Sequence, residues 1–397
     1  MRKIGVVVAA TLLAVGMART SWAEDGVTDN EITIGVFAPL SGSLANYGTD
    51  VVNAAKMMYE RANAAGGVNG RKIRFIIEDA KCSPNDANAV AKKLVTVDKV
   101  FLLNGGSCTG AASAIQGYVE RVGVPHVMLN ASGDPALFPP SKHVFGGFGG
   151  TQNTVGNAMM KFAIEKLRAK TVSYIATDDD YGLANYAAAK AVADAAGVKI
   201  VSYDRIPKQI DDVTPTMLRV LQAKPDVIIS ASYPQGAVLI AQARGNYGMT
   251  QPLIQATQGL SSPALFAKNV GDDSLLKDFY FTDVLIDQPD SKALQPFYDM
   301  YRTAYPDRKD IASYMPFGIA SSMTVLDGLK RAGRNLTREG FVDALEKTNL
   351  DTGVYSGPVE FGKVRRDAVR SNNVLKFDGK TSEVVGRYNW DGTSARQ

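Results

Sequence analysis

The stretch EITIGVFAPLSGSLANYG, residues 31–48, decides the fold that we predict for this chain of 397 residues. Its first part, Glu31–Phe37, is typical of a strand, and the polar loop Pro39–Gly48 follows it. Apolar residues then recur at helical spacing over 50–65, and a glycine-rich turn ends that helix. A further strand at 73–77 completes a strand–helix–strand unit, which is typical of a parallel sheet.

The same alternation continues along the chain and starts again near residue 170. Residues 71–106 and 198–233 both have the order strand, polar loop, helix, strand and small-residue loop. The length also suggests about two lobes. The sequence therefore predicts an α/β protein with two similar lobes, each with a parallel central sheet, and Gly146–Gly150 is the expected crossing between them.

The first 23 residues are typical of a cleavable export signal. Arg2 and Lys3 precede the apolar run Ile4–Met17, and small residues stand before an expected cut after Ala23. That run is shorter than the roughly 20 residues of a spanning helix, so we expect cleavage and a protein in a Gram-negative periplasm rather than a membrane anchor. Without the signal, basic and acidic residues are nearly equal in number, which gives no case for a nucleic-acid partner.

Five loops that follow predicted strands are the candidate ligand-binding segments, because open parallel sheets bind ligands at the carboxyl ends of their strands. Small polar residues and backbone N–H groups in such loops fix a ligand, and the aromatic residues Tyr47, Tyr181 and Tyr233 cover its body. The alternative is that Ser, Gly and Tyr are ordinary loop residues here. The five loops are 39–48, 104–110, 130–134, 177–182 and 231–236.

The loop Gly106–Gly110 fits the pattern of a nucleophile elbow, which gives a rival interpretation as a cysteine hydrolase using Cys108. That class needs a histidine base late in the chain, whereas His126 and His143 come soon after the cysteine and His126 lies in an apolar strand. We therefore expect no enzyme. A helix starting near Gly110 offers free N–H groups, and the Thr109 hydroxyl adds a donor, which together suit a carboxylate.

Cys82 and Cys108 are the two cysteines of the chain, and an exported protein with an even number of them is expected to pair them. The alternatives are two free buried thiols or a metal site. Two cysteines without nearby histidines make a poor zinc site, so we expect neither a metal nor a cofactor.

Several phrases resemble the periplasmic leucine/isoleucine/valine-binding proteins of ABC uptake systems. The similarity covers essentially the whole mature chain, and it implies a type I periplasmic binding fold with a three-strand hinge, a solute between two closing lobes, a monomer, and an inner-membrane ABC permease as partner. It places lobe one at 30–150 plus 283–359 and lobe two at 151–282 plus 360–397. The phrases are EITIGVFAPLSGSLANYG, ERANAAGGVNGRKI, EDAKCSPNDAN, VPHVMLNASGDPAL and DDDYG.

The resemblance also implies the ligand-binding residues. An aromatic position in the first loop, a disulfide with a carboxylate-binding hydroxyl beside it, a second carboxylate-side loop and two aromatic contacts from lobe two all have counterparts here. Gly133 stands where the family has a threonine. The implied residues are Tyr47, Thr109, Gly110, Ala131, Ser132, Gly133, Tyr181, Tyr233 and Gln258, with the disulfide Cys82–Cys108.

Gln258 departs from the family at the position where amino-acid binders have a glutamate. A glutamate neutralises the ligand's α-ammonium, and an unpaired ammonium in a closed cleft would cost several kcal/mol. We therefore expect a carboxylate without an α-ammonium, such as a benzoate, hydroxybenzoate or phenylpropenoate. The alternative is that another acidic residue nearby replaces the glutamate and the ligand is a branched-chain or other aliphatic amino acid.

Overall fold

The structure is a computed structural model of the chain. It describes residues 24–42, 44–131, 133–256, 262–285, 293–308, 311, 314–355 and 357–390. The expected signal peptide, Ser132 and Gln258 lie outside these described residues.

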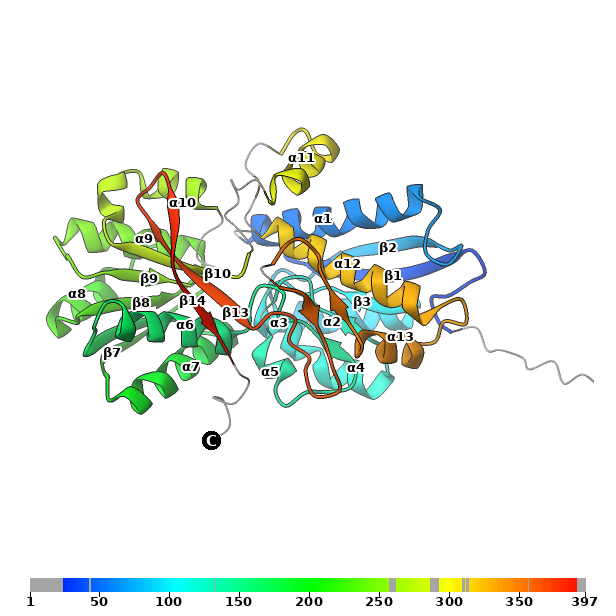
Figure 1. Cartoon of the computed structure of the whole chain (residues 1–397), viewed down its shortest axis with the longest axis horizontal. Helices are drawn as coiled ribbons and strands as arrows, with labels where there is room; N and C mark the ends of the chain where they lie inside the picture. Colours follow the sequence, from blue (N-terminus) through cyan, green and yellow to red (C-terminus); the bar gives the residue numbers. More distant parts are fainter. Residues whose placement is uncertain are drawn as a thin grey trace, which may run out of the picture.

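The first sheet has five parallel strands in the order β2-β1-β3-β4-β5. Helices α1 to α5 connect these strands, and α12 packs along α1 although it comes much later in the chain (Figure 1). The strands are β1 (Glu31–Ala38), β2 (Lys72–Asp79), β3 (Leu102–Asn104), β4 (His126–Val127) and β5 (Val144–Phe145). The helices are α1 (Ala45–Ala64), α2 (Pro84–Thr96), α3 (Thr109–Ala114), α4 (Gln116–Val122), α5 (Asp134–Leu137), α11 (Gln295–Ala304), α12 (Met315–Ala332) and α13 (Arg338–Leu345).

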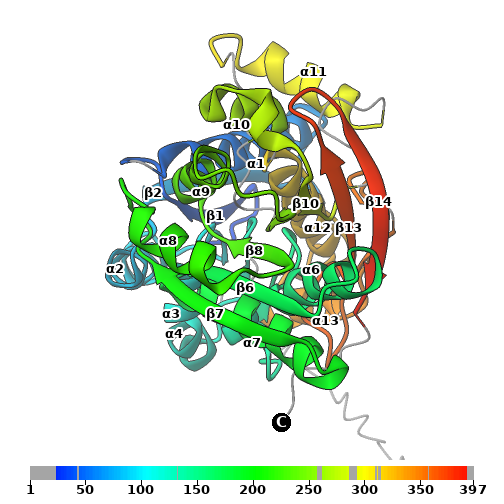
Figure 2. The same ribbon diagram turned by 90° about the vertical axis from the view of Figure 1, so that its left-hand side faces the viewer.

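The second sheet has seven strands in the order β14-β13-β10-β9-β8-β6-β7. Five of them are parallel, whereas β13 and β14 form an antiparallel pair at the edge opposite β7 (Figure 2). The strands are β6 (Thr171–Thr177), β7 (Lys199–Ile206), β8 (Val227–Ala231), β9 (Leu253–Gln255), β10 (Phe279–Asp283), β13 (Ser371–Phe377) and β14 (Ser382–Asn389). The helices are α6 (Gln152–Glu165), α7 (Asp180–Ala196), α8 (Thr214–Ala223), α9 (Pro234–Asn246), α10 (Pro263–Val270) and the 3₁₀ turn η2 (Asp273–Leu276). A short pair, β11 (Asn349–Leu350) and β12 (Val359–Glu360), precedes β13.

The chain passes between the two sheets three times: after β5, after β10 and before β13. The first and third passages contact each other, because Gly146 N–H donates to the carbonyl of Arg366 (2.9 Å) and Ala368 N–H donates to the carbonyl of Gly146 (2.8 Å). The two α/β halves therefore lie side by side and are joined by adjacent passages (Figure 1). The α/β class and the two-sheet architecture predicted from sequence are confirmed. The antiparallel edge of the second sheet was not predicted from the sequence.

Helix α1 begins earlier than the sequence suggested. Residues up to Gly48 were predicted as loop, but α1 starts at Ala45 and includes Tyr47 in its first turn. Gly48 is required for a close approach and not for a turn, because a Cβ added there would lie 2.2 Å from the carbonyl oxygen of Pro39. The helix predicted over 111–122 is likewise two helices, with a break at Ile115 between α3 and α4.

Hydrophobic side chains fill both halves. One large buried cluster includes β1, β3, α1 and α12, and a second lies under α8, α9 and α10 of the second sheet. Among the described residues, no helix combines the length and the apolar character that a membrane span needs.

Candidate functional site

Four buried tyrosines meet between the two sheets. Tyr47 comes from α1 and Tyr314 from the residue before α12, while Tyr181 lies in α7 and Tyr233 precedes α9. Ring centroids are 4.7 Å apart for Tyr47 and Tyr314, 6.0 Å for Tyr47 and Tyr233, and 5.2 Å for Tyr181 and Tyr233. Each is at most 4% exposed. The structure thus brings together the three tyrosines expected from sequence and adds Tyr314.

Burial keeps these hydroxyls protonated. It raises the pKa of Tyr47, Tyr181 and Tyr233 well above the ordinary tyrosine value. The hydroxyl of Tyr181 has no hydrogen-bond partner among the described residues. A buried hydroxyl without a hydrogen-bond partner costs about 1–3 kcal/mol of stability, and the folded protein already bears that cost. Tyr181 can therefore donate to a polar ligand group at little further desolvation cost.

The expected disulfide between Cys82 and Cys108 is present, with 5.4 Å between the Cα atoms. It joins the loop after β2 to the residue that precedes α3. A cysteine in a disulfide has no thiolate, so Cys108 is not the nucleophile of a hydrolase. His126 is buried, its Nε2 lies 2.9 Å from the carbonyl oxygen of Gly105, and burial lowers its pKa to about 4. It is a core residue, as expected from its apolar strand.

No group of three His, Cys, Asp or Glu side chains within the described ranges is arranged to hold a metal ion.

Thr109 begins α3 beside the disulfide and is 3% exposed. Its hydroxyl oxygen accepts a hydrogen bond of 2.9 Å from Nε2 of Gln152, which begins α6 under the second sheet. Gly110 lies close to the other half too, since a Cβ added there would be 3.7 Å from Oδ2 of Asp180. Thr109 and Gly110 therefore face the junction of the two halves.

The loop after β4 packs against the same region. Ala131 N–H donates to the carbonyl of Gly106 at 3.2 Å. Gly133 has a φ of +70°, and a Cβ added there would lie 2.5 Å from Sδ of Met128. The positive φ of Gly133 is a conformation that favours glycine, and a larger residue there would require the Met128 side chain to move. Asn130 is a further buried side chain here, and neither its Nδ2 nor its Oδ1 has a partner among the described residues.

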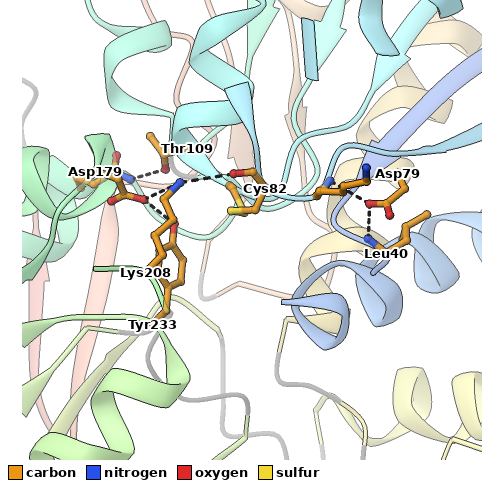
Figure 3. The surroundings of a disulfide bond; sticks show 10 residues. Leu40, Asp79, Cys82, Thr109, Asp179, Lys208 and Tyr233 are labelled. Carbon is orange, nitrogen blue, oxygen red and sulfur yellow. Dashed lines mark hydrogen bonds and ion pairs between the residues drawn. A yellow bond between two sulfur atoms is a disulfide. The ribbon is translucent and has the colours of Figure 1, made fainter. Parts of the chain in front are cut away.

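Lys208 links the two halves at the disulfide, and sequence analysis missed it. Its ammonium lies 3.5 Å from Oδ2 of Asp179 and 3.4 Å from the carbonyl oxygen of Cys82, on the Thr109 side of the junction (Figure 3). Asp179 also accepts from the Tyr233 hydroxyl (3.3 Å). Burial raises the pKa of Asp179, while hydrogen bonds and the charge of Lys208 oppose that rise. Lys208 lies in the loop that follows β7, an edge strand. That loop is not one of the five candidate loops, so the sequence did not indicate Lys208 as a site residue.

A cavity of about 360 Å³ adjoins the tyrosines, and we call it the outer cavity. Tyr47, Tyr233 and Lys208 form its wall toward the tyrosine cluster. Its size is at the lower end of the range for small-molecule sites. Its remaining lining residues are Leu44, Asn46, Pro234, Gln235, Val238, Leu239, Leu265 and Asn269.

Two α/β halves are joined by three passages, and aromatic and polar side chains of both halves converge between them. Such an arrangement is typical of proteins that bind a small solute between two lobes. The profile of the periplasmic binding protein family matches residues 31–381, and the chain belongs to this family. Within it, the chain is similar in sequence and fold to type I substrate-binding proteins of branched-chain amino acid ABC systems. This class consists of substrate-binding transport proteins and not of enzymes.

Relatives of known name support this placement. A Leu/Ile/Val-binding protein homolog 7 from Brucella abortus is 24% identical over 337 residues, covering 81% of this chain and 82% of that protein. An amino acid binding protein from Pseudomonas aeruginosa is 26% identical over 215 residues, and the chain spans 57% of its length.

Solved structures show the same fold. LivJ from Streptococcus pneumoniae in complex with isoleucine has a TM-score of 0.76 at 22% identity, covering 90% of this chain and 99% of that one. A solute-binding protein from R. palustris in complex with 4-hydroxybenzoate has a TM-score of 0.77 at 19% identity, covering 91% and 97%. The fold thus houses both an amino acid and an aromatic acid in these two proteins.

Proposed function

We propose that this protein is the periplasmic receptor of an ABC uptake system and that its ligand is a small aromatic carboxylate. The observation that carries the proposal is the cluster of four buried tyrosines contributed by both halves, in which the Tyr181 hydroxyl has no partner among the described residues. Flat apolar faces suit a ring, and a buried hydroxyl donor suits a carboxylate oxygen. Thr109, Gly110, Ala131, Ser132 and Gly133 are the proposed carboxylate side.

The charges near the site favour an acid over an amino acid. Gln258 supplies no negative charge for an α-ammonium. Asp179 is the acidic residue that could replace the missing glutamate, but its carboxylate is already engaged by Lys208, by the Tyr233 hydroxyl and by the N–H of Gly182. An ammonium group brought to Asp179 would have to compete with a lysine.

The mechanism that we propose is hinge closure. Lobe one is residues 30–150 plus 283–359, lobe two is 151–282 plus 360–397, and the three passages between the sheets act as the hinge. Export by the segment 1–23, cleaved after Ala23, brings the receptor to the periplasm, where the closed monomer delivers its ligand to an inner-membrane permease.

A thermal-shift panel tests the ligand class. Protein freed of bound ligand by unfolding and refolding is melted with benzoate, 4-hydroxybenzoate and phenylpropenoate, and in parallel with leucine, isoleucine and valine. A true ligand at a hundredfold excess over its Kd stabilises the fold by about 2.7 kcal/mol. We expect that stabilisation from an aromatic acid, and we expect Gln258→Glu to weaken it through carboxylate repulsion. Stabilisation by leucine while every aromatic acid fails would overturn the proposal in favour of an aliphatic amino acid.

A further inference from the structure

The outer cavity is continuous with the tyrosine cluster, because Tyr47 and Tyr233 belong to both. Its lining includes four apolar side chains, Leu44 from one half with Val238, Leu239 and Leu265 from the other, beside the polar Asn46, Gln235 and Asn269. A single aromatic ring held between the tyrosines would leave the four apolar side chains without an apolar partner. The cavity therefore has room and a suitable surface for a part of the ligand that extends beyond one ring.

Lys208 is the charged residue in the lining of this cavity. Its side chain runs past Tyr233 and places the ammonium beside the disulfide, toward Thr109 (Figure 3). The two contacts of the ammonium, to Asp179 at 3.5 Å and to the Cys82 carbonyl at 3.4 Å, are both longer than a strong charged hydrogen bond. A carboxylate that arrives between Lys208 and Thr109 can therefore add a contact to this ammonium while the Lys208–Asp179 pair stays in place.

The same end of the cavity has a second source of positive potential. Helix α9 begins at Pro234 and its first turn has no side-chain cap, while Pro234 and Gln235 line the cavity. The N-terminus of a helix carries a partial positive charge. Lys208 and the start of α9 therefore both add positive potential to the lining of the cavity.

We propose that the outer cavity is an extension of the ligand site, that it takes the ring of an elongated aromatic carboxylate, and that Lys208 pairs with the carboxylate. The inference rests on the proposed function and narrows it from aromatic acids in general to arylalkanoates and arylpropenoates. The carboxylate lies between Lys208 and Thr109, the chain passes the tyrosines, and the ring lies against Leu44 and Val238.

The first test uses chain length. Calorimetric titration compares benzoate with phenylacetate, 3-phenylpropanoate, 4-phenylbutanoate and 5-phenylpentanoate on the full mature protein. Burial of each methylene is expected to raise affinity about fourfold until the cavity is full. Val238→Phe fills the cavity and should remove the gain of the longer acids while benzoate still binds. Leu218→Phe is the matched control, because Leu218 is 44% exposed on α8 and does not line the cavity.

The second test isolates the charge of Lys208. Lys208→Gln should weaken 3-phenylpropanoate tenfold or more and leave 3-phenylpropanamide nearly unchanged, since the amide has no charge to pair. Arg205→Gln removes the same charge from the end of β7, where Arg205 is about half exposed and pairs with Asp178 at 3.1 Å, and should leave both ligands unaffected.

The outcomes separate the two levels of the proposal. If benzoate binds but affinity does not rise with chain length, or if Val238→Phe leaves the rise intact, the extension is wrong and the aromatic-acid receptor stands. If Lys208→Gln lowered the affinity for 3-phenylpropanoate and for 3-phenylpropanamide equally, the proposed pairing of Lys208 with the carboxylate would be wrong. Binding of leucine with no binding of any acid would overturn both the extension and the proposed function.

Discussion

Asp283, the last residue of β10, carries a buried carboxyl group where the chain passes from the second sheet to the first. It is 4% exposed, and its Oδ1 accepts from the N–H of Leu285 at 3.1 Å. Burial raises the pKa of this carboxyl to about 7, because desolvation outweighs the backbone hydrogen bonds that lower it. The protonated form is therefore favoured in the folded protein over a range in which the unfolded chain has released the proton.

This shift makes stability depend on pH in a defined direction. The folded pKa is the higher one, so the contribution of Asp283 is fully present below about pH 4 and is lost as the pH rises to about 7. Asp283→Asn should remove that loss. Relative to the natural protein, the variant should gain about 2–3 kcal/mol in unfolding free energy between pH 5 and pH 8, measured by urea denaturation. The exposed Asp343→Asn serves as control, and an Asp283→Asn difference that is the same at both pH values would contradict the prediction.

At the scale of elements, the disulfide fixes the start of α3 against the loop that leads into α2. This matters for the site because Thr109 directly follows Cys108, and Cys82 presents its carbonyl oxygen to Lys208. Two parts of the candidate site that come from different loops are thus covalently linked. Gly133 constrains the next loop sterically, because a Cβ added there would lie 2.5 Å from Sδ of Met128.

Replacing the disulfide by Cys82→Ser with Cys108→Ser should lower the unfolding free energy by about 3.5 kcal/mol, the chain-entropy value for a loop whose ends are separated by 26 residues. Thermal denaturation with and without reductant measures this. Reductant should lower the melting temperature of the natural protein to that of the double variant and leave the variant itself unchanged. A melting temperature of the variant that equals that of the oxidised protein would show that the bond contributes nothing.

At the scale of the whole molecule, several contacts between the halves lie at the candidate site. Tyr47 meets Tyr233, Thr109 meets Gln152, and the Lys208 ammonium meets the Cys82 carbonyl. These contacts can form only when the halves are close together. An open form would separate them and expose the tyrosines, so ligand binding is expected to shift the population toward the arrangement described here.

Spin labels on opposite walls of the outer cavity can measure this closure. Asn46→Cys and Asn269→Cys place one label on α1 and one on α10, and both asparagines are exposed. Both natural cysteines are in the disulfide, so only the introduced thiols react. Benzoate, which is too short to fill the outer cavity that the labels border, should shift the distance distribution to shorter values. The pair Gln222→Cys and Asn269→Cys, within the second half, should not change; a shift in that pair, or none in the first, would contradict hinge closure.

Much of the fold and part of the site could be predicted from the sequence. Helical spacing over 50–65 and the strand patterns report which side of each element is buried, and that information is local. The pairing of two cysteines in an exported chain and the tyrosines at strand ends follow from equally local signals. These predictions therefore agree with the structure in the α/β alternation and the disulfide, and the structure places Tyr47, Tyr181 and Tyr233 close together, while their contact with a ligand stays a prediction.

The sequence by itself determined the alternating elements, the two lobes and the chemistry of most candidate side chains. Only the tertiary structure decided that Tyr314 returns to α1 beside Tyr47, and that Lys208 reaches the disulfide of the other half. The antiparallel edge β13–β14 and the early start of α1 were also decided only by the tertiary structure. The physical reason is that periodicity records the burial of each segment, whereas the meeting of segments more than a hundred residues apart depends on how the three passages set one sheet against the other.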